Sequence, residues 1–295
     1  MAASISVKRP APKRGAGTVL ALERGIALLG CFEPGCGALS NGELSRRTGI
    51  PKPTLTRLTA TLVSLGLLKQ VRGDDRYELA AGVLSFAQAF LGGLDIRAQA
   101  RPHMVELAES LGASVYLAVC EGIEMVLIET CRSSSTVLHS RLDVGSRLQI
   151  PNSALGRAYA AALEPIERKH LLDRMCAQYT KRGASSRAEW ARLPAEFDQA
   201  LEQGRAQGFC TSMGAWHPDI HSIAVPLRSA NAQLFAINCG GPAFAFSADR
   251  LQQAGPRLLG TARAIARDIG GSVPDLKTSG ASAGPRRAPY REARA

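Results

Sequence analysis

The segment between Ser40 and Gly66 constrains the fold most strongly, because it predicts two short helices separated by only a few residues. Ser40 and Glu43 have the spacing of a capping box, which predicts the start of a helix. Gly49 stands where a glycine ends a helix after about two turns. Pro53 suits the first turn of the next helix, since its missing N–H has no helical partner there. This spacing indicates a helix-turn-helix.

Elements on both sides extend these two helices to a larger module. A preceding helix is predicted over 18–32, with Thr18 as its N-cap, because four apolar residues share one face: Val19, Leu22, Ile26 and Leu29. The helix that begins near Pro53 is expected to bury Leu55, Leu58, Leu62 and Leu65. Short strands are expected at 67–71 and 76–79 around a turn at 72–75. The whole order predicts a winged helix-turn-helix domain over 17–80.

The charge distribution favours a nucleic-acid contact in this first part. The chain of 295 residues has a formal net charge of +11. Residues 1–80 contain 12 Lys and Arg against 6 Asp and Glu, whereas residues 81–272 contain 19 against 17. Positive charge confined to one region favours contact with a polyanion, and a basic surface that only aids solubility is the alternative. Residues 1–16 and 273–295 are expected to be disordered basic tails.

A major-groove contact is expected from the third helix, whose N-terminal end leads into the groove in helix-turn-helix proteins. Cationic and hydroxyl side chains, which contact phosphates and base edges, occur on both helices and beside the hairpin turn. The predicted DNA-binding residues are Arg46, Arg47, Lys52, Thr54, Arg57, Arg72 and Arg76. An adaptor whose winged helix binds protein instead of DNA is the alternative.

A linker helix is expected over 81–101, between the basic module and the rest of the chain. Its apolar face predicts a dimer surface, or else packing onto its own chain; the residues of this face are Val83, Phe86, Ala87, Phe90, Leu91 and Leu94.

Residues 102–272 predict a second domain of mixed helices and strands. Strands are expected at 114–121, 123–130, 136–141, 220–227 and 233–239. Helices are expected at 102–111, 153–162, 165–176, 192–207 and 248–269. Antiparallel strands with helices beside them indicate an α+β fold.

Several classes of function find no support in the sequence. No stretch reaches the roughly 18 to 20 apolar residues of a membrane span, and no signal peptide is recognisable, so a cytoplasmic protein without a membrane partner is expected. The seven cysteines are interpreted as small buried side chains. Phosphate-loop, dinucleotide and serine-nucleophile patterns are absent, so neither a cofactor nor catalysis is expected. A small hydrolase that pairs Cys120 or Cys239 with a histidine is the enzymatic alternative.

The chain resembles the IclR family of bacterial transcriptional regulators over about residues 18–270. The order and spacing of several short motifs carry the resemblance: Glu43-Leu44-Ser45-Arg46-Arg47-Thr48-Gly49-Ile50-Pro51-Lys52-Pro53-Thr54, Arg57-Leu58, Arg76-Tyr77-Glu78-Leu79, Leu155-Gly156-Arg157-Ala158, Gly208-Phe209 and Gly240-Gly241-Pro242. It implies a winged helix-turn-helix, a linker helix and a C-terminal GAF-like α/β ligand-sensing domain. It also implies dimers or dimers of dimers on a palindromic double-stranded DNA operator. Pro53 departs from the family, which often has a serine that can contact phosphate there.

The resemblance further implies a pocket for a small-molecule effector, often a carboxylic or aromatic acid. Small residues at a helix N-terminus agree with this, since exposed N–H groups favour an anion, although they also permit close helix–sheet packing. Trp216 and His217 are expected to form a wall or lid. The predicted effector-binding residues are Ser153, Ala154, Leu155, Gly156, Ser212, Trp216, His217, Ser222, Asn238 and Gly240.

The segment 213–221 contains unusual chemistry. His217, Asp219 and His221 are possible metal ligands, but Pro218 argues against a helix that would place both histidines on one face. A metal site, a pocket wall and an ordinary surface loop all stay open.

Overall fold

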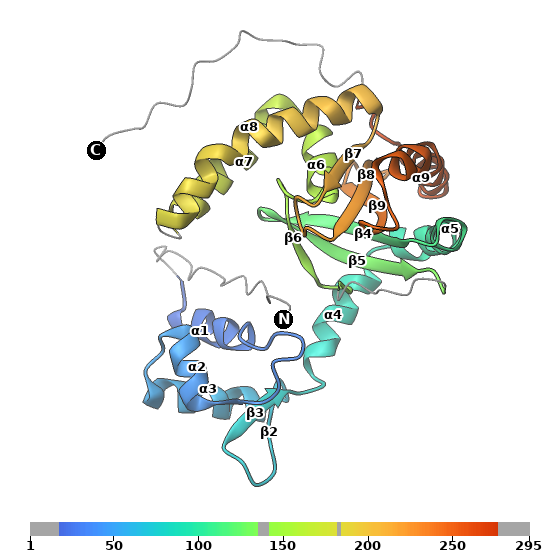
Figure 1. Cartoon of the computed structure of the whole chain (residues 1–295). Coiled ribbons are helices and arrows are strands. Elements are labelled where there is room, and N and C mark those ends of the chain that lie inside the picture. The colour runs from blue at the N-terminus through green and yellow to red at the C-terminus, as the bar shows by residue number, and fades with distance from the viewer. Residues whose placement is uncertain (1–17, 135–141, 182–183, 277–295) are drawn as a thin grey trace. The chain divides into compact units, whose positions relative to one another are not determined.

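The computed structural model describes residues 18–134, 142–181 and 184–276 of the 295. The chain divides into two compact units between Gly93 and Leu94. The first unit contains four helices and a small sheet among its described residues (Figure 1). Its elements are α1 (Leu20–Leu29), β1 (Leu39–Ser40), α2 (Asn41–Thr48), α3 (Lys52–Ser64), β2 (Leu68–Gln70), β3 (Arg76–Leu79) and α4 (Val83–Gly92). The strands form an antiparallel sheet in the order β1-β3-β2.

The capping signals act as predicted around α2. The Ser40 side chain accepts a hydrogen bond from the Glu43 N–H, and the Glu43 carboxylate accepts one from the Ser40 N–H at 2.8 Å. Gly49 ends the helix in the left-handed conformation at φ 70°, which glycine adopts without strain. Pro53 lies in the first turn of α3. A helix-turn-helix followed by a wing is therefore present.

Helix α1 begins later than predicted and buries another face. Val19 rather than Thr18 is its N-cap, and it makes no side-chain capping bond. The buried residues of α1 are Gly25 and Leu28, which adjoin the core formed with α2 and α3. The predicted apolar face remains largely exposed, with Leu22 at 65% and Ile26 at 52%.

Two other differences from the predictions concern the small core of this unit. Leu65 is 63% exposed, because α3 ends at Ser64 and Leu65 lies beyond its last full turn. Thr59 takes a buried position instead, and its hydroxyl donates to the carbonyl of Thr56. Strand β1 was not predicted; it has only two residues, too few to show an alternating pattern.

The second unit has an antiparallel six-stranded sheet in the order β6-β5-β4-β9-β8-β7. Its strands are β4 (Ser114–Glu121), β5 (Glu124–Arg132), β6 (Arg147–Gln149), β7 (Cys210–Met213), β8 (Ile220–Arg228) and β9 (Leu234–Pro242). Its helices are α5 (Ile96–Leu111), α6 (Ala154–Ala161), α7 (Pro165–Lys181), α8 (Ala184–Gln207) and α9 (Ala248–Asp268). Helices α5 and α9 cover one face of the sheet, and α6 lies on the other with α7 and α8 beside it (Figure 1). This α+β arrangement confirms the predicted fold class.

Several boundaries differ from those expected. The structure divides the predicted linker helix 81–101 into α4 and α5, with a break at residues 93–95, and Pro102 lies inside α5 instead of at its start. Strands β6 and β7 were not predicted, since each is only three or four residues long. The expected strand at 136–141 lies outside the described residues.

Candidate functional site

Helix α3 presents a polar face to solvent. Its buried residues Leu55, Thr59 and Leu62 recur at helical spacing and pack into the unit. Lys52 and Arg57 lie on the opposite, exposed side, and Thr54 is half-buried between the two. The exposed side therefore carries the cations of this helix.

The predicted DNA-contact residues differ in how firmly the unit holds them. Arg47 donates from Nη1 to the carbonyl of Cys31 at 2.9 Å, which links α2 to the end of α1. Arg76 forms an ion pair of 3.5 Å with Asp74 inside the wing. Within the described parts of the chain, the other predicted cations form no ion pair, and all are exposed: Arg46, Lys52, Arg57 and Arg72.

A second candidate site lies on the face of the large sheet that α6 covers. Residues paired across neighbouring strands point to the same side, so the register defines this face. Gly240 of β9 pairs with Ser114 of β4 and with Ser222 of β8. Asn238 pairs with Tyr116 and Ala224 in the next row on this face. Small and polar side chains thus form a floor beneath the N-terminus of α6.

A cavity of about 30 Å³ opens above this floor. Six predicted effector residues line it: Ser153, Ala154, Trp216, Ser222, Asn238 and Gly240. The remaining lining residues were not predicted; they are Ser114, Tyr116, Leu142, Leu148, Ile220, Gly241 and Pro242. Strand β4 is buried on both faces from Ser114 to Ala118, so its sequence has no polar–apolar alternation that would have identified Ser114 and Tyr116. The volume is enough for one or two water molecules, so a larger ligand requires surrounding side chains to move.

Ser153 is the N-cap of α6. Ser153 Oγ accepts from the Gly156 N–H at 3.1 Å and donates to the Gln149 carbonyl at 2.7 Å. Its single hydroxyl proton is therefore already used. Since Ala154 lines the cavity, the positive end of the helix dipole lies at the cavity wall.

Four predicted effector residues do not line the cavity. Leu155 is buried in the core, and Gly156 packs so closely that a Cβ would lie 2.2 Å from the Cα of Ile150. Ser212 donates to the Asn152 carbonyl at 2.7 Å. His217 is in the loop that follows β7, next to Trp216. None of the four is therefore in contact with the cavity.

Asn238 differs from the other polar residues here. It is only 7% exposed, and within the described residues its Oδ1 has no hydrogen-bond partner. A buried polar atom without a partner is uncommon in proteins and needs an explanation.

The structure does not assemble a metal site from the histidine loop. His221 Nδ1 lies 2.9 Å from the Phe246 carbonyl oxygen, and His217 Nδ1 is 4.0 Å from Asp219. No group of three or more potential metal ligands occurs within residues 18–134, 142–181 and 184–276.

The cysteines proposed for the hydrolase alternative are poor nucleophiles. Burial raises the pKa of the Cys239 thiol to about 12, so it is protonated near neutral pH. Burial likewise raises the pKa of Cys120, although Tyr159 opposes this by a hydrogen bond. Cys239 also lies on the opposite side of β9 from Asn238, away from the cavity floor.

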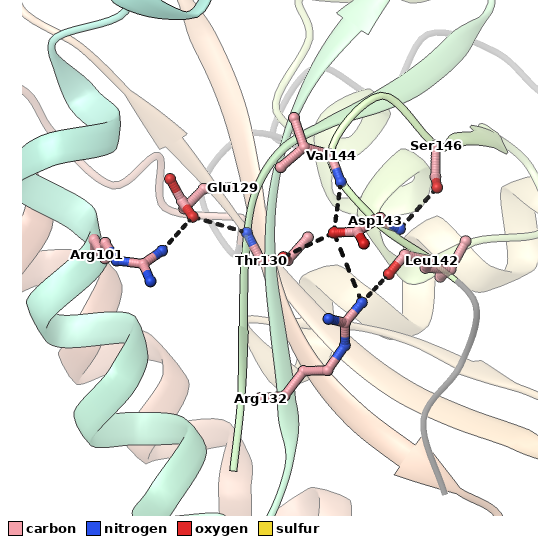
Figure 2. A network of polar contacts seen from close by, with 8 residues as sticks. All are labelled: Arg101, Glu129, Thr130, Arg132, Leu142, Asp143, Val144 and Ser146. Carbon is pink, nitrogen blue, oxygen red and sulfur yellow. Dashed lines mark hydrogen bonds and ion pairs between the residues drawn. The ribbon is translucent and has the colours of Figure 1, made fainter. Parts of the chain in front are cut away.

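A polar network joins the cavity wall to α5 (Figure 2). Arg132 of β5 donates from Nη2 to the carbonyl of Leu142, a cavity residue. Thr130 Oγ1 donates to Asp143 at 3.4 Å, and the Thr130 N–H donates to the Glu129 carboxylate at 3.2 Å. Glu129, 5% exposed, forms ion pairs with Arg97 at 2.9 Å and Arg101 at 2.7 Å.

A helix-turn-helix with an exposed cationic face and a second unit with a cavity are the parts of a DNA-binding regulator with a ligand-binding domain. The comparisons with known proteins agree. The model of the IclR helix-turn-helix domain matches residues 21–72, and that of the bacterial transcriptional regulator IclR C-terminal domain matches residues 88–267. The chain belongs to the IclR family of transcriptional regulators, which are DNA-binding proteins with a ligand-binding C-terminal domain rather than enzymes.

Individual relatives support the same assignment. The chain is 27% identical to the HTH-type transcriptional regulator TsaQ1/TsaQ2 of Comamonas testosteroni over 239 residues, covering 80% of this chain and 83% of the relative. It is 27% identical to the Pca regulon regulatory protein of Pseudomonas putida over 219 residues, covering 73% and 71%. The crystal structure of an IclR family transcriptional regulator from Brucella abortus matches with a TM-score of 0.72 and 34% identity, covering 86% and 94%. No helix among the described residues is long and apolar enough to span a membrane.

Proposed function

We propose that this regulator binds a palindromic operator as a dimer and that a small carboxylic or aromatic acid in the α6 cavity changes its affinity for that operator. Residues 17–80 are the DNA-binding domain in this proposal, and residues 102–272 are the effector domain. The carrying observation is a cavity that combines an apolar wall, a helix N-terminus and a buried amide. Sites of this composition suit a small ligand with one or two polar groups.

The DNA contact assigned to α3 rests on its exposed cations. Lys52, Thr54 and Arg57 are assigned to the major groove, and Arg46 and Arg72 to phosphates on either side. Arg47 and Arg76 are also assigned to phosphates. Arg47 uses only Nη1 for its bond to the Cys31 carbonyl, and Arg76 uses Nε for its ion pair with Asp74, so each has other N–H groups for a phosphate. Each Arg has five N–H donors, so one internal bond does not prevent a phosphate contact.

The dimer is assigned to apolar residues that the monomer leaves in solvent. No residue of α4 is buried, and Phe86 and Phe90 are 65% and 52% exposed. The face of α1 formed by Val19, Leu22 and Ile26 is exposed as well. Large apolar side chains that gather on a surface mark an interface more often than isolated ones do.

The network that ends at Glu129 supplies a route from ligand to DNA-binding domain. A ligand that displaces Leu142 acts on Arg132 through the Leu142 carbonyl. Glu129 lies three residues earlier on the same strand and holds α5, which follows α4 after residues 93–95. Ligand occupancy and the position of the linker helices are coupled in this proposal.

The test uses the full chain in three steps. An operator is first selected from a random pool of duplex DNA by the purified protein. A thermal-shift screen of small carboxylic and aromatic acids then identifies ligands, since a bound ligand raises the melting temperature. Fluorescence anisotropy of the labelled operator finally measures each ligand's effect. A protein that selects no sequence, or whose operator affinity no stabilising acid changes, contradicts the proposal.

A further inference from the structure

The unpartnered amide of Asn238 carries an inference about the chemistry of the ligand. Asn238 is 93% buried and lines the cavity, and its Oδ1 has no partner within the described chain. An unpaired buried acceptor destabilises the empty protein, and a ligand that donates a hydrogen bond to it removes that penalty. The position of this amide therefore suits hydrogen bonding to a ligand better than it suits packing against apolar neighbours.

Among the polar side chains that line the cavity, Asn238 is the one with a buried atom that lacks a hydrogen-bond partner within the described residues. Ser153 already uses its hydroxyl proton on the Gln149 carbonyl. Among the described residues that line the cavity there is no Lys, Arg or His, so none of them offers a carboxylate a cationic partner. The N-terminus of α6, at Ser153 and Ala154, is the place where a negative group is favoured.

With Oδ1 of Asn238 facing the cavity, a carboxylate is poorly matched to this side chain. A carboxylate only accepts hydrogen bonds, so it would face Oδ1 without a proton between them. A hydroxyl group both donates and accepts, and it satisfies the amide in either orientation of its oxygen and nitrogen. The remaining wall is apolar and partly aromatic, with Tyr116, Leu148 and Trp216 among its residues.

We infer that Asn238 selects a ligand hydroxyl, so that the effector is a small hydroxy-substituted aromatic acid. Its carboxylate points to the N-terminus of α6, and its hydroxyl binds the amide. This inference rests on the proposed function, because it names the ligand class of the same cavity.

The test measures binding through Trp216, a cavity residue and one of two tryptophans. Trp190→Phe removes the other tryptophan from the signal. The probes are benzoate, its 2-, 3- and 4-hydroxy derivatives and the matching methoxybenzoates, which keep the oxygen but lose the proton. At least one hydroxybenzoate is expected to bind about tenfold more tightly than benzoate and than its methoxy partner.

Asn238→Leu is the matched variant, because leucine has a similar shape without polar atoms. It should abolish the preference for hydroxybenzoate and leave benzoate binding within about twofold. Its melting temperature without ligand should equal or exceed that of the parent, since an unpaired polar atom is removed. Asn238→Ala provides a second variant with the same expected loss of preference.

The outcomes separate this inference from the proposed function. An unchanged hydroxyl preference in both variants overturns the role of Asn238, as does methoxybenzoate binding equal to that of hydroxybenzoate. If no probe binds, the assignment of a hydroxy-substituted aromatic acid is wrong. The operator-binding measurement then still tests the proposed DNA-binding function separately. A hydroxybenzoate that binds through Asn238 but never alters operator affinity supports the inference and contradicts the proposed regulation.

Discussion

Arg101 of α5 and Glu129 of β5 form a hydrogen-bonded ion pair of 2.7 Å, which fastens the first helix of the effector unit to the sheet. Arg97, one helical turn earlier, binds the other carboxylate oxygen at 2.9 Å. Both arginines lie near the start of α5, close to the division between the two units. One buried carboxylate thus holds the end of α5 through which a ligand signal would pass.

Glu129→Gln should destabilise the protein by about 2 kcal/mol, because it removes the charge that two arginines share while keeping the side-chain shape. Urea unfolding followed by circular dichroism measures this. Glu121→Gln, an exposed position at the end of β4, is the control and should change stability by less than about 0.5 kcal/mol. Equal effects at the two positions would show that the buried ion pairs contribute nothing.

Arg57→Ala should weaken operator binding by about 1–3 kcal/mol without changing the melting temperature, since Arg57 is exposed and makes no ion pair among the described residues. Anisotropy titrations with the selected operator provide the measurement. Arg263→Ala, an exposed arginine of α9, is the matched control for loss of one positive charge. If both variants bind equally well, α3 does not lie in the major groove.

The capping box of α2 predicts a dependence of stability on pH. The Ser40 N–H and hydroxyl donate to Glu43 and hold the pKa of its carboxyl below the usual value of 4.5. A lowered folded-state pKa gives stability that is present above the unfolded-state pKa and lost as the pH falls through the folded-state pKa. The stability difference between the parent and Glu43→Gln should therefore be largest near neutral pH and shrink below about pH 4.5.

Thermal unfolding between pH 3 and pH 7 measures this difference for the capping box. Glu106→Gln, a glutamate that lies on α5, serves as the control. A gap between the parent and Glu43→Gln that stays constant over this range would show that the hydrogen bonds to Ser40 do not favour the ionised carboxylate.

Phe86→Glu should convert a dimer to a monomer, because it places a charge in the apolar face assigned to the interface. Light scattering after size-exclusion chromatography determines the mass. Gln88→Glu introduces the same charge on another face of α4 and should leave the dimer intact. Monomerisation by both variants, or by neither, argues against this face.

Local signals made the helix boundaries predictable where a residue acts on its own neighbours. Ser40 and Gly49 fix helix ends through contacts within five residues, and both act as expected. The short strands β1 and β6 were missed, since their pairing partners are distant in sequence. Strand β7 pairs with the next strand along the chain and was missed because it has only four residues.

The cavity was predictable only in part for the same reason. The small residues near Ser153 indicated a helix N-terminus, but the floor depends on the register of β4, β9 and β8. Gly156 was expected to contact a ligand, but its missing side chain instead allows close contact with the backbone of Ile150. The missing partner of Asn238 has no signal in the sequence, because it depends on which side chains the folded sheet places opposite the amide.

The pleat of the sheet separates two tasks that neighbouring residues perform. Along β9, Asn238 faces the cavity, while Ile237 and Cys239 face the layer of α5 and α9. In β5, Thr130 and Arg132 lie on the same face of the sheet as the cavity floor. Glu129 lies on the opposite face, where it forms its ion pair with Arg101 of α5. Substitutions on the cavity face of these strands can therefore change which ligand binds without changing the residues on the opposite face that hold α5. In the proposed function, such a sheet could bind new effectors while the contacts that anchor α5 stay constant.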